Sequence, residues 1–169
     1  MGVFDRLFKK EESGIEVQTE PGVLYLPVEG EVIPIADIGD GVFSEGILGP
    51  GCGIRPTGET VYAPADGKVT TVAETLHALG LQTGDGAEVL IHVGMDTVEM
   101  KGTGFEVLVK EGQKVRCGQP LLKFSRDKIK AAGYPTTTAF VITNGDEFSE
   151  VTVLQNGILK KLTAIMRIK

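Results

Sequence analysis

Residues 75–97 read TLHALGLQTGDGAEVLIHVGMDT, and this stretch decides the fold class. Two apolar runs, HALGLQ and AEVLIHVG, flank the turn sequence TGDG, which occupies residues 83–86. Short apolar runs on either side of a turn rich in Gly and Asp are typical of a β-hairpin. We therefore expect two antiparallel strands joined at residues 83–86.

This hairpin carries both histidines of the chain, His77 and His92. If the turn is centred on residues 84–85, the two histidines oppose each other directly, with Cβ atoms about 4.5–5.5 Å apart. If it is centred on residues 85–86, they are diagonal neighbours at about 7–8 Å. Both registers place the rings on one face of the hairpin, and only a one-residue bulge would separate them.

A lone pair of histidines suits phosphoryl transfer, because one imidazole can act as nucleophile while the other donates to the phosphoryl oxygens. A zinc site would need a third ligand, and Thr75 is a poor nucleophile for a serine-type triad. In the first register Thr75 opposes Gly94, and this leaves a small gap for an oxyanion beside the rings. Gly94 also lies two residues after His92, so we expect it to leave room for a phosphoryl group. Two structural histidines on a strand surface are the alternative.

The rest of the chain repeats short apolar runs punctuated by Gly, Pro and Asp, which predict further strands. The phrase YLPVEGEV at residues 25–32 recurs as YAPADGKV at residues 62–69. This repeat predicts an all-β fold, a β-sandwich built from duplicated halves. The clearest helix is expected at Ser125–Ala132, where Ser125 is a suitable N-cap and Gly133 a suitable stop.

Composition narrows the function classes. The 169 residues suit one domain, and 41% hydrophobic with 24% charged residues is typical of a globular chain. A net charge of −6, 6% aromatic residues and no Trp argue against nucleic-acid binding. No apolar run approaches the roughly 18 residues of a spanning helix. The start MGVFDRLFKK lacks the apolar stretch of a signal peptide, so we expect a cytoplasmic protein with Cys52 and Cys117 reduced.

Residues 1–20 differ from the remainder and are expected to form a flexible, amphipathic N-terminal tail ahead of a single domain at residues 21–169. Apolar side chains recur there at helical spacing with basic neighbours, which favours weak contact with a membrane surface or a partner through residues 3–10. A frayed end is the alternative, because so short a helix is marginal in water. The apolar positions are Val3, Phe4, Leu7 and Phe8, and the basic ones are Arg6, Lys9 and Lys10.

The segment GAEVLIHVGMDTV at residues 86–98 resembles the phosphorylation-site signature of the glucose-family IIA components of the bacterial phosphoenolpyruvate-dependent sugar phosphotransferase system. Further motifs of this family follow in order over residues 20–169. They are IGDGVFSE at 38–45, GCGIRPTG at 51–58, APADG at 63–67, EMKGTGF at 99–105 and ITNGD at 142–146.

The resemblance implies an all-β fold, an antiparallel β-sandwich of the duplicated hybrid-motif type with a few short helices. It also implies that the protein acts as a phosphocarrier without cofactor or metal. It implies that His92 accepts phosphoryl from the histidine phosphocarrier protein, that His77 stabilises it, and that Thr75 orients His77. The phosphoryl group then passes to a cysteine of a sugar-specific IIB domain of a membrane transporter. The implied partner-binding residues are the flanking acids Asp40 and Asp96 and an exposed apolar rim of Val42, Phe43, Ile47 and Val98.

Three other classes fit less well. A zinc peptidase of the LytM type would need a His-x-His pair and a third histidine, and a lipoyl- or biotinyl-type carrier would need a lysine in the TGDG turn. A purely regulatory module of the same fold would need neither histidine, whereas this chain has both. The chain also departs from many family members at Ala73, Leu76 and Leu90, where aromatic or polar residues are frequent, and this concerns partner preference.

Overall fold

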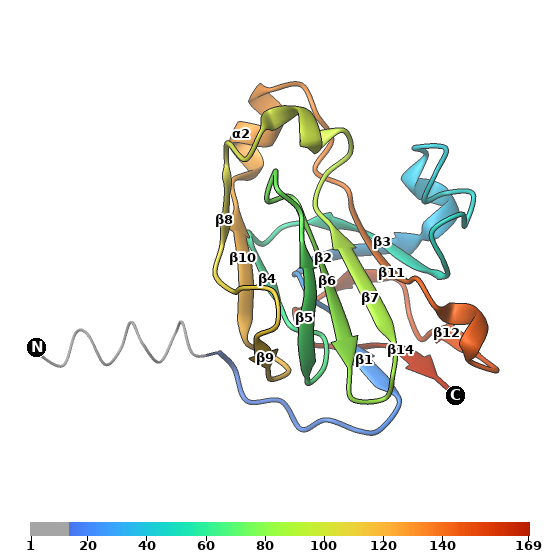
Figure 1. Cartoon of the computed structure of the whole chain (residues 1–169). Coiled ribbons are helices and arrows are strands. Elements are labelled where there is room, and N and C mark those ends of the chain that lie inside the picture. Colours follow the sequence, from blue (N-terminus) through green and yellow to red (C-terminus); the bar gives the residue numbers. More distant parts are fainter. Residues whose placement is uncertain (1–13) are drawn as a thin grey trace, which may run out of the picture.

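The computed structural model describes residues 14–169, and antiparallel strands make up most of its regular secondary structure (Figure 1). One sheet has eight strands in the order β13-β2-β3-β11-β7-β6-β5-β9, and two sheets have three strands each, β1-β14-β12 and β4-β10-β8. The expected all-β antiparallel sandwich is confirmed.

The large sheet contains β2 (Gly30–Pro34), β3 (Gly51–Pro56), β5 (Gly67–Val72), β6 (Ala78–Thr83), β7 (Glu88–His92), β9 (Lys114–Val115), β11 (Thr138–Ile142) and β13 (Gly157–Leu159). The small sheets contain β1 (Val23–Tyr25), β12 (Val151–Val153) and β14 (Ala164–Ile168), and β4 (Thr60–Tyr62), β8 (Phe105–Val107) and β10 (Pro120–Phe124).

The duplication expected from the repeated phrase is visible in the backbone. The Tyr25 N–H donates to the Pro64 carbonyl over 2.9 Å, and the Tyr62 N–H donates to the Pro27 carbonyl over 2.7 Å. Each copy therefore binds the other in the same way, as two halves related by an approximate two-fold axis must. The order of the large sheet agrees, because β2 and β5 occupy matching places from its two ends.

Successive side chains along each strand point to opposite faces of the large sheet, which therefore has a core face and an outer face. Leu79 and Leu81 of β6 and Val89 and Ile91 of β7 lie in the main core, where they pack with side chains of both small sheets. Burying an aliphatic side chain of this size contributes about 1.5–3 kcal/mol. The intervening residues of β6 and β7, His92 among them, consequently project from the outer face.

Short helices connect the strands: η1 (Ile35–Ile38), η2 (Thr97–Met100), α2 (Arg126–Ala131) and η3 (Gly145–Glu147). The helix expected at Ser125–Ala132 is confirmed as α2, and the Ser125 hydroxyl accepts the Lys128 N–H over 3.2 Å as an N-cap.

The register of the histidine hairpin differs from both expected registers. Ala78, not His77, pairs with His92. The reason is a three-residue loop, since the Thr83 N–H donates to the Ala87 carbonyl and Gly86 adopts φ +89°. Such a loop ends in a left-handed residue, which Gly supplies at no steric cost, and it moves the ladder by one position.

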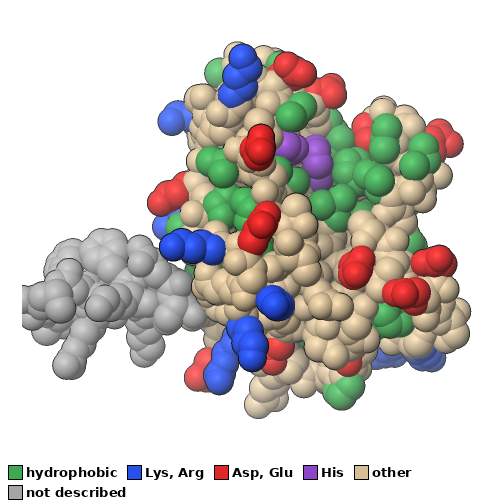
Figure 2. Space-filling model, viewed as in Figure 1, with side chains coloured by type: hydrophobic (Ala, Val, Ile, Leu, Met, Phe, Trp, Pro, Cys, Tyr) green, Lys and Arg blue, Asp and Glu red, His purple; other side chains and the backbone are tan. Residues whose placement is uncertain are grey.

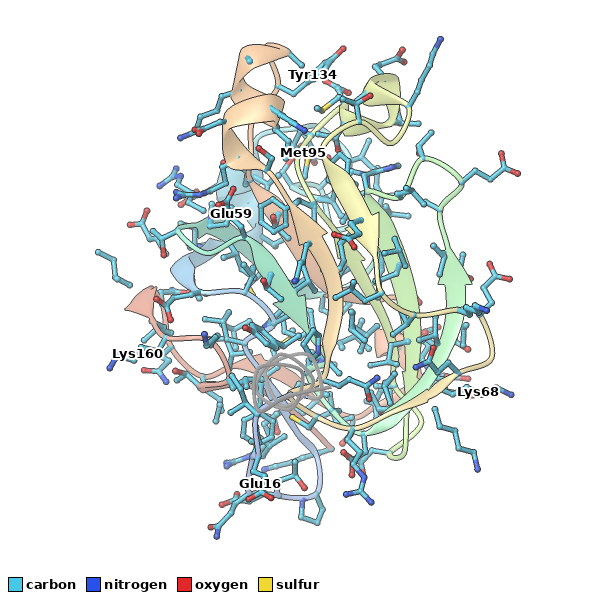
Figure 3. The ribbon with its side chains drawn as sticks, turned by 90° about the vertical axis from the view of Figure 1, so that its left-hand side faces the viewer. Glu16, Glu59, Lys68, Met95, Tyr134 and Lys160 are labelled. Carbon is cyan, nitrogen blue, oxygen red and sulfur yellow. The ribbon has the colours of Figure 1, made fainter. Side chains whose placement is uncertain are left out.

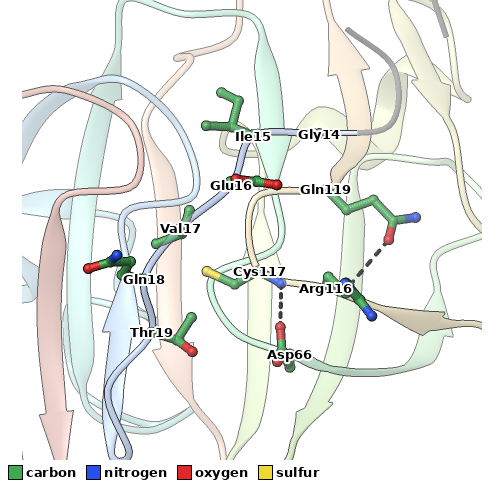
Figure 4. Close-up of a pocket in the computed structure, with 10 residues that line it drawn as sticks. All are labelled: Gly14, Ile15, Glu16, Val17, Gln18, Thr19, Asp66, Arg116, Cys117 and Gln119. Atoms are coloured by element: carbon green, nitrogen blue, oxygen red, sulfur yellow. Dashed lines mark hydrogen bonds between the residues drawn. The ribbon is translucent and has the colours of Figure 1, made fainter. Parts of the chain in front are cut away.

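Residues 14–19 lie along the domain at the end opposite the histidine ends of β6 and β7 (Figures 1 and 3). The Ile15 N–H donates to the Gly118 carbonyl over 3.1 Å, and the Tyr25 hydroxyl donates to the Gln18 carbonyl over 3.2 Å. Residues 14–19 and Cys117 line a cavity of about 1070 Å³ (Figure 4). The expected membrane contact at residues 3–10 lies outside the described residues.

Candidate functional site

His92 ends β7 on the outer face of the large sheet. Ala78 of β6 and Ala139 of β11 lie directly opposite it on the two neighbouring strands. Directly opposed Cβ atoms in a sheet are only about 4.5–5.5 Å apart. Because both neighbours are alanine, the imidazole has space on either side.

His77 reaches the same place from just outside β6. In a regular ladder at the observed register its side chain would point into the core, because the Val93 N–H pairs with the His77 carbonyl. The preceding residue, Leu76, instead adopts φ +64°, which bends the backbone. The two rings therefore meet despite the shifted register, with centroids 4.7 Å apart and planes at 84°.

Hydrogen bonds assign different tasks to the ring nitrogens. His92 Nδ1 lies 2.8 Å from the Gly94 carbonyl. A carbonyl only accepts, so Nδ1 carries the proton and Nε2 keeps its lone pair. His77 Nδ1 lies 2.8 Å from the Thr75 hydroxyl, which leaves Nε2 of His77 unengaged by that contact. Thr75 is thus positioned to orient the ring of His77.

Burial keeps both imidazoles neutral near pH 7. Burial, and then the adjacent His77, lower the pKa of His92 from 6.5 to about 4, against the opposing effects of the Gly94 carbonyl and the Asp40 charge. Burial also lowers the pKa of His77, against the opposing effect of the Thr75 backbone. A neutral imidazole with a free Nε2 lone pair is the nucleophilic form.

Gly94 does not serve the purpose expected from its position. Its φ is +76°, and a Cβ there would collide with the side chain of Thr97 and lie 3.0 Å from the Pro135 carbonyl. The glycine is required by backbone conformation and by this packing, not by space for a phosphoryl group. Thr75 and Gly94 are also not paired in the ladder. The Gly94 carbonyl is the contribution that the sequence analysis missed, since no side-chain pattern signals a backbone acceptor.

Phe43 is buried, so the expectation that it is exposed at the rim is wrong. Only 5% of Phe43 is exposed, and its ring centroid lies 5.1 Å from that of His92. The Asp40 carboxylate accepts the N–H groups of Phe43 and Ser44, each over 3.0 Å, and this turn directs the phenyl ring inward. Phe43 packs there with Met95 and Val141 as part of a small outer cluster.

The other apolar residues of the expected rim are exposed. Val42, Ile47 and Val98 are 43%, 69% and 47% exposed, respectively. Figure 2 shows apolar side chains around the two histidines. Such a ring of apolar surface about a small polar centre is typical of a docking face.

Acidic residues surround this face. Burial raises the pKa of the Asp40 carboxyl, but the N–H groups of Phe43 and Ser44 outweigh it and lower the pKa overall. Asp96 is exposed at the start of η2, with φ +60°. The segments 35–50, 73–77 and 93–100 contain no Lys or Arg, and their acids are Asp37, Asp40, Glu45, Glu74, Asp96 and Glu99.

The described residues contain no cluster of three or more His, Cys, Asp or Glu side chains placed to hold a metal ion. Cys52 and Cys117 are buried, and burial raises the pKa of each thiol to about 12, so neither is a nucleophile near pH 7. Within residues 14–169, no helix combines the length and the apolar character needed to cross a membrane.

Fold and site together define a β-sandwich with paired imidazoles beside an exposed apolar rim and several acidic side chains. Residues 22–148 match the model of the family described as phosphoenolpyruvate-dependent sugar phosphotransferase system, EIIA 1, and the chain belongs to this family.

Several named proteins are similar to it. The glucose-specific EIIA components of Haemophilus influenzae and Staphylococcus aureus (strain COL) are 35% and 38% identical, over 100% and 97% of this chain and 99% and 97% of their own lengths. The beta-glucoside-specific EIIBCA component of Bacillus subtilis is 41% identical over 85% of the chain, which spans only 24% of that relative. The solved structure of glucose permease IIA from Mycoplasma capricolum matches with a TM-score of 0.80 and 28% identity, over 90% of this chain and 98% of that one.

Proposed function

We propose that the chain is a phosphocarrier in which Nε2 of His92 accepts a phosphoryl group from the histidine phosphocarrier protein and passes it to a cysteine of a IIB domain. The observation that carries the proposal is the neutral His92 ring, held through Nδ1 by the Gly94 carbonyl with the Nε2 lone pair free beside a second imidazole. In the first step the donor's N–P bond breaks as the P–Nε2 bond forms. In the second, that bond breaks as the cysteine thiolate forms a P–S bond, and neutral His92 returns.

His77 stabilises the phosphoryl group in this proposal. The incoming group adds about −1.5 to −2 charges by analogy with other phosphoryl modifications, so it favours protonation of a neighbouring imidazole. With Nδ1 of His77 in contact with Thr75, Nε2 remains to donate to a phosphoryl oxygen. Neither step requires a metal or a cofactor.

The docking face accounts for the partners. An apolar rim flanked by several acids favours partners that carry apolar contacts and Lys or Arg around their own reacting group. Asp40 and Asp96 belong to this acidic ring, and Val42, Ile47 and Val98 to the rim. The fusion of EIIA with IIB and IIC parts in relatives named EIIBCA supports a IIB domain as the acceptor. We place the protein in the cytoplasm, where the general phosphotransferase proteins act.

The test is phosphorylation by labelled phosphoenolpyruvate and the two general phosphotransferase proteins, followed by mapping of the labelled residue. We expect an acid-labile label on His92. A label on His77, or no label when a known IIA component is labelled in parallel, would contradict the proposal.

A further inference from the structure

The turn that follows β7 decides where the Gly94 carbonyl points. His92 is the last residue of β7, and its Nδ1 lies 2.8 Å from the carbonyl two residues further along the chain. The ladders with β6 and β11 end at His92, and the chain enters η2 at Thr97. Contacts outside the sheet must therefore fix the direction of the Gly94 carbonyl.

Thr97, the first residue of η2, closes this turn with a buried hydrogen bond. Its hydroxyl donates to the Val93 carbonyl over 2.6 Å, and both residues are fully buried. The side chain of Thr97 also packs against Gly94, because a Cβ added at Gly94 would collide with its methyl group. Thr97 thus holds both the peptide group that precedes Gly94 and the Cα atom of Gly94 itself.

A second contact holds the other side of Gly94. The Met95 N–H donates to the Pro135 carbonyl over 3.1 Å. This N–H and the Gly94 carbonyl belong to one trans peptide group, so they point in opposite directions. The peptide group is hydrogen-bonded at both ends, to Pro135 on one side and to His92 on the other. Each of these bonds polarises the group in the sense that strengthens the other.

The loop that carries Pro135 is anchored by α2. The Tyr134 N–H donates to the Ile129 carbonyl over 3.1 Å, and Ile129 is fully buried in the main core. Figure 3 shows Met95 and Tyr134 at the same end of the molecule. The Pro135 carbonyl is consequently a fixed support behind the turn, provided by a helix more than thirty residues later in the chain.

We infer that Thr97 is a positioning residue for the phosphoryl acceptor, which acts through the turn at residues 93–96 to keep the proton of His92 on Nδ1. Thr97 itself is fully buried, so it contacts neither the phosphoryl group nor a partner. Without the Gly94 carbonyl in place, the proton redistributes between the two ring nitrogens, and the Nε2–H tautomer has no lone pair at the attacking atom. The inference rests on the proposed function and adds to it what selects the nucleophilic tautomer.

The test removes the hydroxyl of Thr97 and keeps the shape of the side chain. Thr97→Val replaces the hydroxyl by a methyl group, and Thr97→Ser keeps a hydroxyl on a smaller side chain. Thr83→Val is the matched control, because Thr83 is also buried and its hydroxyl accepts the Ala87 N–H over 3.1 Å in the turn at the far end of the same hairpin. Thermal unfolding shows which variants are folded, and Thr97→Ala is measured if Thr97→Val is not.

Two measurements separate positioning from a general loss of stability. Nitrogen–proton correlation NMR of the histidine rings at neutral pH reports which nitrogen of His92 carries the proton. Single-turnover transfer from the phosphorylated histidine phosphocarrier protein, against its concentration, reports the maximal rate and the half-saturating concentration.

We expect His92 to be protonated on Nδ1 in the unsubstituted chain and in Thr83→Val. In Thr97→Val the Nε2–H tautomer should become populated, and the maximal rate should fall roughly tenfold or more, since small displacements of a reacting group are costly. The half-saturating concentration should not change, because the docking surface is untouched. Thr97→Ser should recover most of the rate.

A normal tautomer or a normal maximal rate in folded Thr97→Val would overturn the inference and leave the proposed function intact. An equal loss in Thr83→Val, no recovery in Thr97→Ser, or failure of both Thr97→Val and Thr97→Ala to fold would show a general role in packing and would also overturn it. Failure of the unsubstituted chain to accept phosphoryl would overturn the proposed function, on which the inference rests.

Discussion

At the residue scale, the two histidines are chemically alike but differ in what holds them. The Gly94 carbonyl fixes the proton of His92 on Nδ1, whereas the Thr75 hydroxyl can either donate to His77 or accept from it. His92 is therefore restricted to the nucleophilic tautomer, and His77 is free to change its protonation. The sequence identified both rings and Thr75 because they are side chains in a short motif. It could not identify the Gly94 carbonyl, since every residue offers the same backbone acceptor.

Substitution of each histidine separates these roles. We expect His92→Ala to abolish phosphoryl acceptance, because the nucleophile is lost. His77→Gln should still accept phosphoryl but pass it on about 10²–10³-fold more slowly, since a neutral amide replaces a chargeable donor. Single-turnover transfer from labelled protein to a IIB domain measures both. Label retained by His92→Ala, or normal onward transfer by His77→Gln, would contradict the assignment.

The low pKa of His92 predicts how the protein responds to acid. The ring has a pKa of about 4 when folded and about 6.5 when unfolded, so the unfolded state binds the proton first as the pH falls. The stabilisation by the neutral ring is complete above about pH 6.5 and is lost progressively down to about pH 4, by about 3 kcal/mol in all. Histidine NMR titration should show one ring still neutral at pH 5. A midpoint near 6.5 for both rings would contradict this.

The buried position of Phe43 changes what its removal should do. Phe43→Ala is expected to destabilise the fold by about 3 kcal/mol or more, because it leaves a cavity between segment 35–50 and the sheet. Ile47→Ala, at a site 69% exposed, should leave stability within about 0.5 kcal/mol and mainly weaken docking. Denaturant unfolding of both variants is the measurement. An unchanged midpoint for Phe43→Ala would show that its ring contributes nothing to packing.

At the element scale, the hairpin shows how far a turn motif determines geometry. The flanking apolar runs and TGDG predicted both strands, because alternation and turn composition are local properties. The observed register is shifted by one residue from each of the two expected registers, because Gly86 in a left-handed conformation makes the loop three residues long. The histidine rings still meet, but through the bend at Leu76 in the turn between β5 and β6, where the Leu76 N–H donates to the Ala73 carbonyl over 2.8 Å. Counting residues to decide which face of a sheet a side chain occupies works only within a regular strand. His77 lies just before the first residue of β6.

At the scale of the whole molecule, the duplicated sandwich has two unlike ends. The histidines and the surrounding acidic residues occupy one end, and residues 14–19 lie at the other, as the position of Glu16 relative to Met95 shows (Figure 3). The repeat in the sequence predicted the duplicated architecture but not this polarity. Which end receives the tail depends on contacts far apart in sequence, such as that between Ile15 and Gly118.

This separation predicts that the tail and the phosphoryl site act independently. Removing residues 1–18 should leave the rate of phosphoryl acceptance unchanged, because the described part of this segment, residues 14–18, lies at the end of the domain opposite the histidines. It should expose the thiol of Cys117, which packs against Val17 and is 6% exposed, to alkylation at raised pH. Removing residues 1–13 alone should leave Cys117 protected but abolish binding to anionic lipid vesicles, since the amphipathic residues 3–10 are gone. Thiol labelling, vesicle sedimentation and phosphorylation of the full chain and both truncations test this together. A fall in phosphoryl acceptance in either truncation, with thermal stability retained, would show that the two ends are coupled.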